Sequence, residues 1–194
     1  MSLTRIVAIA LLLTATTSGA ARAGQRSTPN PVGETAAMTQ FKAAITDYMA
    51  LRNRLRSEIR GPVPASTAVE LNQASDALAA AIQRARAGAR AGSIFKVPVA
   101  DMIKRRVGEV VTSDQLGPVL ADIDDEDPTV RTPTVHLRFP AASQMATMPP
   151  SLLAALPELP KELEYRIVGT YLVLRDVDAA LVLDYIPAAV PRKP

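Results

Sequence analysis

The chain has 194 residues, a formal net charge of +3 and no cysteine or tryptophan. This length allows one adequate hydrophobic core, or a helical unit together with a small sheet. The lack of cysteine excludes disulfides and lipid attachment to a cysteine. A weak net charge with only three Phe and four Tyr argues against nucleic acid as a partner.

The first 23 residues have the pattern of a secretory signal peptide. The basic residue Arg5 precedes an apolar run over residues 6–13, and small residues around Arg22 offer a cleavage site. The apolar run is far shorter than the roughly 20 residues that span a bilayer. We therefore expect an exported protein, periplasmic or secreted, whose mature chain begins near Gly24. Removal of Arg5 and Arg22 would lower its net charge from +3 to +1.

A helical unit is expected over residues 34–127, after a flexible leader at residues 24–33. Apolar residues recur at three- and four-residue steps over residues 34–60, which predicts an amphipathic helix. A capping box formed by Thr67 and Glu70 predicts the start of a second helix. The first two helices are expected to form an antiparallel hairpin. The residues expected to face the core from the second helix are Leu71, Ala74, Leu78, Ile82 and Ala85.

Two further helices are predicted in this unit. Pro98 favours the first turn of a third helix, which should run to Val111. Ser113 or Asp114 is expected to cap a short fourth helix.

The charges in this unit are unevenly distributed. Residues 42–106 contain twelve basic and five acidic residues, whereas residues 109–127 contain seven acidic and no basic residues. A basic helical face could meet an anionic surface such as lipid head groups or acidic glycans, or the helical unit could neutralise its own acidic neighbour. The candidate contacts with an anionic surface are Arg52, Arg56, Arg60, Lys104, Arg105 and Arg106.

An acidic run at residues 122–127 begins like a calcium-binding loop, with carboxylates at alternate positions. The sixth position is Asp127, where the loop needs glycine, and the twelfth is Pro133, where it needs a bidentate glutamate. We expect an acidic linker there and assign no metal ligand and no cofactor. The single histidine, His136, is expected on the solvent side of a strand and not in a zinc site.

The C-terminal module is expected over residues 128–194. Alternating residues predict a short strand over residues 134–139, with Val135, Leu137 and Phe139 facing inward. Proline in its first turn predicts a short helix from Met148. The leucines expected to pack that helix on the sheet are Leu152, Leu153 and Leu156.

The last predicted element is a three-stranded antiparallel meander over residues 163–186. Leu163, Tyr165 and Ile167 should be buried in its first strand, and Glu164, Arg166 and Val168 should face water. Gly169 suits the first central position of a type II′ turn. Aspartates in the turn at residues 176–179 can cap their own backbone, and Pro187 should end the third strand. The predicted fold class is α+β, with an N-terminal helical hairpin or bundle, a short helix and this meander.

Parts of this C-terminal segment also resemble known proteins. The runs Ala146–Leu153, Leu156–Pro157, Leu159–Pro160, Leu163–Gly169 and Leu172–Asp176 are similar to the close of a group of uncharacterised exported bacterial proteins. The proline-led hairpin is more distantly similar to the terminal module of periplasmic nickel/cobalt-homeostasis proteins. The resemblance implies an envelope location and a small β module without an activity. The histidine-rich character of metal handling is missing, so no binding residue is carried over.

The motifs of several enzyme classes are missing from the sequence. It has no Gly-x-Ser-x-Gly elbow, phosphate loop or dinucleotide fingerprint. We therefore expect a non-enzymatic envelope protein that acts as a protein-binding or structural module, with no catalytic residue assigned. The alternatives are binding to an anionic surface through the basic helical face and a carboxylate-dependent hydrolase. The carboxylates available to a hydrolase are Glu158, Glu162, Glu164, Asp176, Asp178 and Asp184.

Overall fold

The computed structural model describes residues 31–59, 67–114, 116, 132–138 and 148–191. The chain has an α+β fold with a C-terminal antiparallel meander, as predicted. Its described helices are α1 (Pro31–Glu58), α2 (Ala68–Ala85), α3 (Val97–Ser113) and α5 (Pro150–Ala155), and its strands are β1 (Leu163–Val168), β2 (Tyr171–Asp176) and β3 (Leu181–Ile186). Within these ranges, no helix combines the length and apolar character that a membrane span requires.

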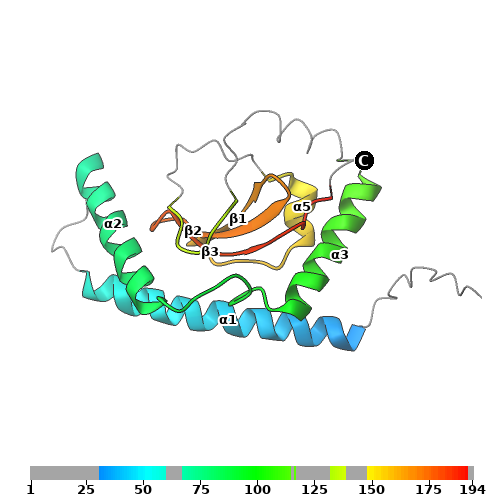
Figure 1. Ribbon diagram of the computed structural model, residues 1–194, viewed down its shortest axis with the longest axis horizontal. Helices are drawn as coiled ribbons and strands as arrows, with labels where there is room; N and C mark the ends of the chain where they lie inside the picture. Colours follow the sequence, from blue (N-terminus) through cyan, green and yellow to red (C-terminus); the bar gives the residue numbers. More distant parts are fainter. Residues whose placement is uncertain (1–30, 60–66, 115, 117–131, 139–147, 192–194) are drawn as a thin grey trace, which may run out of the picture.

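The helix α1 forms the base of the molecule. In Figure 1, α2 and α3 rise steeply from opposite ends of α1, and the sheet lies between them. The helices α1 and α2 therefore cross at an angle and do not lie alongside each other as the expected hairpin would. The apolar face of α1 packs against other elements. The Phe41 ring stacks on Phe95, and Phe95 stacks on Tyr165 of β1.

The start of α1 differs from the prediction. The helix begins at Pro31, so residues 31–33 are helical and do not belong to a flexible leader. Proline suits the first turn because its fixed φ is already helical and its missing N–H is not needed there. The rest of the expected leader and the signal segment lie outside the described residues.

The capping box of α2 is confirmed. The Glu70 N–H donates to Thr67 Oγ1 at 3.2 Å, and the Thr67 N–H donates to Glu70 Oε2 at 3.0 Å. Leu78 and Ile82 are buried as expected. Leu71 is 58% exposed, which contradicts its predicted place in the core. The N-terminal half of α2 projects away from the sheet, so the apolar stripe has no sheet beneath it there (Figure 1).

Residue Ala85, also expected in the core, is exposed at the end of α2, and Ala74 is partly buried.

The helix α3 follows the prediction closely at its start. Its end differs, because Ser113 is its last residue and Asp114 is its C-cap. Neither residue therefore begins a new helix. The rest of the predicted fourth helix and the acidic run at residues 122–127 lie outside the described residues.

The three strands pair in the order β1-β2-β3, as predicted. Gly169 has φ 56° in the connection between β1 and β2, so the residue without a Cβ occupies the left-handed position. The expectation of a wet outer face is wrong for Val168. This residue packs with buried Val173 and Val182 in a second small apolar cluster, which Leu137 and two tyrosines adjoin.

The predicted strand at residues 134–139 is not present as a strand. A single bridge joins Arg138 to Leu181, and the His136 N–H donates to the Val182 carbonyl at 2.8 Å. His136 has φ 71°, which turns the chain where a strand would need an extended backbone. Phe139 lies outside the described residues.

Leu152 of α5 and Leu156, the C-cap of this helix, are buried in the core as predicted, and α5 packs against α3. Leu153 is 52% exposed and so does not join the core as predicted. The larger of the two apolar clusters includes buried residues from all four described helices and all three strands. Helices and meander therefore share one core.

Candidate functional site

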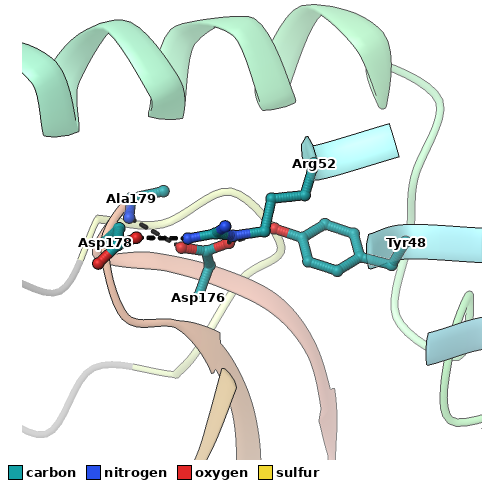
Figure 2. A network of polar contacts seen from close by, with 5 residues as sticks. All are labelled: Tyr48, Arg52, Asp176, Asp178 and Ala179. Carbon is teal, nitrogen blue, oxygen red and sulfur yellow. Dashed lines mark hydrogen bonds and ion pairs between the residues drawn. The ribbon is translucent and has the colours of Figure 1, made fainter. Parts of the chain in front are cut away.

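The polar cluster at the end of β2 joins α1 to the sheet (Figure 2). Asp176 Oδ2 accepts hydrogen bonds from the Tyr48 hydroxyl at 2.6 Å and from Arg52 Nε at 2.7 Å. Asp176 Oδ1 accepts from the Ala179 N–H at 2.9 Å, as predicted for this turn. Arg52 Nη2 also donates to Asp178 Oδ2 at 2.5 Å. We call Tyr48, Arg52, Asp176 and Asp178 the β2 clamp.

Burial sets the charge states in the β2 clamp. The side chains of Arg52 and Asp176 are 4% and 0% exposed, whereas Asp178 is 50% exposed. Burial raises the pKa of Tyr48, and the charge of Asp176 raises it further, so the phenol remains a donor. Burial lowers the pKa of Arg52, but the ion pairs and hydrogen bonds with Asp176 and Asp178 together outweigh this, and the net shift is upward. The β2 clamp therefore contains a buried ion pair between Arg52 and Asp176, and both Tyr48 and Arg52 stay protonated.

The predicted basic surface is wrong at Arg52, because this side chain is buried in the β2 clamp. Its position on the apolar stripe of α1 directs it inward. Arg105 and Arg106 donate to the two carboxylate oxygens of Glu34 at 3.1 Å and 2.6 Å. The hydrogen bond from Arg106 is the largest cause of the lowered pKa of Glu34. The one carboxylate of Glu34 thus offsets one of the two positive charges within the chain.

The remaining candidates do not lie together. Arg56 is exposed in the last turn of α1, and Lys104 is partly buried on α3. These helix segments lie at opposite ends of α1 (Figure 1). Arg60 lies outside the described residues.

Most of the carboxylates considered for a hydrolase form hydrogen bonds or ion pairs within the fold. Besides the two aspartates of the β2 clamp, Glu164 accepts hydrogen bonds from Arg166 and Arg175. Asp184 is completely buried. Its Oδ1 accepts from the N–H groups of Gly92 and Tyr185, both at 2.8 Å. Its Oδ2 accepts from the N–H groups of Ile94 at 2.6 Å and Phe95 at 2.8 Å, which fastens the segment before α3 to β3.

An open groove lies between α1 and the segment 85–96. Its volume is about 540 Å³, within the range of small-ligand and peptide sites. Small residues such as Ala43, Ala44 and Ala89 form much of its surface. Its polar lining residues are Gln40, Asp47, Tyr48, Arg86, Ser93 and Lys96.

Arg86 is the half-buried cation of this groove. Its Cζ lies 5.4 Å from the centroid of the Tyr48 ring, within cation–π range. Its Nη2 donates to Ser93 Oγ at 3.2 Å and to the Leu183 carbonyl at 3.3 Å. Its Nη1 is buried without a hydrogen-bond partner among the described residues. Burial lowers the pKa of Arg86, as expected for a cation taken from water.

His136 is partly buried and not on a solvent-facing strand as predicted. Its carbonyl accepts from Gln83 Nε2 at 3.1 Å, and its Nε2 is buried without a hydrogen-bond partner in the described part of the chain. Burial lowers its pKa, and the charge of Arg86 lowers it further. No group of three or more His, Cys, Asp or Glu residues suited to a metal ion occurs in the described ranges.

We expect His136 to make stability depend on pH. Its pKa lies below the ordinary 6.5 in the folded chain, so the unfolded chain binds more protons as the pH falls. The contribution of His136 to the free energy of unfolding is fully present above about pH 6.5. It decreases as the pH falls toward the pKa of the folded chain. Urea unfolding of the wild type and of His136→Asn at a series of pH values measures the effect. Asparagine tolerates the left-handed backbone and does not titrate, so equal pH dependence in both proteins would contradict the prediction.

Comparison with protein-family models, with curated proteins and with solved structures found no match. The resemblance to exported bacterial proteins and the envelope location therefore stay predictions.

Sequence reasoning did not single out the groove or Arg86. Arg86 lies immediately before a run of alanine, arginine and glycine at residues 87–92. The structure places it one residue past α2, as the C-cap, where its side chain reaches Tyr48 on α1. The sequence contained a partial signal, because Arg86 follows Ile82 by four residues and so continues the buried face of α2.

Proposed function

We propose that this chain is an exported, non-enzymatic envelope protein that acts as a protein-binding module, with the groove between α1 and segment 85–96 as its binding site. Export is supported by the signal-peptide pattern of the first 23 residues. The observation that carries the binding role is Arg86, a half-buried cation at this groove without an ion pair in the described part of the chain.

Arg86 and the buried Arg52 differ in how their charge is compensated. Arg52 has two carboxylate partners, so its charge is compensated within the fold. A desolvated cation without a carboxylate costs free energy, and an acceptor from another molecule would recover part of that cost. A partner that places polar groups in the groove therefore gains affinity from a donor that the fold already holds in place.

The test compares two alanine-to-phenylalanine variants of the tagged mature protein. Ala43 lines the groove and is exposed on α1, so Ala43→Phe should fill part of the groove without disturbing the core. Ala50 is exposed on the same helix and does not line the groove, so Ala50→Phe is the matched control. Proteins captured from envelope extract at low and moderate salt are quantified by mass spectrometry.

We expect a defined partner that survives moderate salt with the wild type and with Ala50→Phe, and whose recovery falls about tenfold or more with Ala43→Phe. Equal recovery of the same proteins by all three chains would contradict the groove as the binding site. Loss of all captured material at moderate salt would instead favour a weak, charge-driven association with an anionic surface.

A further inference from the structure

The groove also suggests which chemical group it recognises. Resting on the proposed binding role, we infer that the groove binds a carboxylate carried by a peptide segment of the partner, and that Arg86 is the residue that recognises it.

Arg86 differs from the other arginines that the fold shields from water. Arg52 pairs with Asp176, Arg175 with Glu164, and Arg106 with Glu34. Each is a guanidinium that meets a carboxylate of its own chain. Arg86 departs from this pattern, because no ion pair involves it among the described residues, although it is half-buried.

The nearby carboxylate of Asp184 cannot supply the missing partner. Its two oxygens already accept four backbone N–H groups, two on each oxygen. Those bonds connect Asp184 of β3 to the segment before α3 and leave its charge only a longer-range effect on Arg86. The Arg86 charge thus remains available to an acceptor from outside.

The fold holds the Arg86 guanidinium in place before any ligand binds. The Tyr48 ring lies on one side of the guanidinium, and the Leu183 carbonyl and Ser93 hydroxyl accept from Nη2. The bond to Ser93, at 3.2 Å, is at the upper limit of the usual N–H···O range, and the bond to Leu183, at 3.3 Å, is slightly beyond it. A carboxylate oxygen forms shorter and stronger bonds with guanidinium than a hydroxyl does, so it can replace Ser93 as the acceptor.

The approach of the ligand follows from the groove lining. Nη1 is shielded from solvent, so the carboxylate must reach the guanidinium from the side of Ser93, which lines the groove. Lys96 is exposed on the same wall and adds a second positive charge, against the single carboxylate of Asp47. The small side chains of Ala43 and Ala89 leave space for a peptide backbone to lie close.

The test uses the full mature protein and three short synthetic peptides made of alanine. The first is N-acetylated with a free C-terminal carboxylate, the second is its C-terminal amide, and the third is the amide with one internal glutamate. Binding to the wild type is measured by NMR titration to millimolar peptide, following the Arg86 Nε–H signal and the backbone amides of residues 85–96. These peptides distinguish a terminal carboxylate from a side-chain carboxylate.

We expect at least one carboxylate peptide to bind about tenfold more tightly than the neutral amide. Arg86→Gln should abolish this difference, and Lys96→Gln should reduce it only slightly because Lys96 is exposed. If Arg86→Gln does not fold, Ala43→Phe provides the second variant, and it should also abolish the difference.

Equal binding of acid and amide peptides would overturn the carboxylate inference, as would the absence of any binding at millimolar concentration. A partner whose recovery still depends on Ala43 would then leave the proposed function standing while this inference fails. Peptide binding that is the same in the wild type and in Ala43→Phe would argue against the groove itself.

Discussion

Replacing Asp176 with alanine should lower the free energy of unfolding by about 3–5 kcal/mol, because it leaves the buried Arg52 without its main counter-ion. Asp176 is completely buried and accepts from Tyr48, from Arg52 and from the backbone of its own turn. Urea unfolding followed by circular dichroism at neutral pH measures the loss.

Two variants in the same cluster provide the controls. Asp178→Ala removes the exposed partner of Arg52, and a pair of that kind contributes only about 0–1 kcal/mol. Tyr48→Phe removes one hydrogen bond to Asp176 and should cost about 1–3 kcal/mol. If Asp176→Ala were no more destabilising than Asp178→Ala, the β2 clamp would not be the link between α1 and the sheet that its geometry indicates.

The parts of the fold that were predicted correctly depend on local patterns. The capping box at Thr67 uses residues three positions apart, and the turn at Gly169 depends on one backbone conformation. Alternation of apolar residues likewise defines strands without reference to the rest of the chain. These signals lie within a few residues of the elements they define, so sequence alone was sufficient.

The errors arise where distant segments decide burial. Leu71 continues the apolar stripe of α2, but that part of the helix extends beyond the sheet. Val168 alternates as a solvent-facing residue, but residues of the second cluster pack against it. His136 reads as part of an extended strand until its positive φ shows a turn. Each outcome depends on what lies opposite, which the local pattern does not contain.

The candidate site could have been inferred in part from charges in apolar positions. Arg52 lies four residues after Tyr48 and three before Leu55, so it falls on the buried stripe of α1. A cation on a buried stripe needs a buried partner, so this position argues against a surface contact. The groove could not be inferred, because its walls come from α1 and from segment 85–96, which no local pattern brings together.

The second large effect is expected at Asp184, an acidic residue within the apolar strand β3. Asp184, like Arg52, can be buried because the fold supplies hydrogen-bond partners for its polar atoms. Asp184→Asn keeps the size of the side chain but turns one acceptor oxygen into an NH₂ group that faces backbone donors. We expect a loss of about 3 kcal/mol in the free energy of unfolding.

The same change should also loosen one wall of the groove. The backbone N–H groups of Gly92, Ile94 and Phe95 all donate hydrogen bonds to Asp184. Hydrogen exchange at these amides should accelerate in Asp184→Asn more than exchange at the strand amides of β1. Asp101→Asn, an exposed change on α3, is the control and should alter stability by less than about 0.5 kcal/mol. Unchanged exchange at residues 92–95 would show that other contacts hold this wall, whereas selective loosening would tie the shape of the groove to one buried carboxylate.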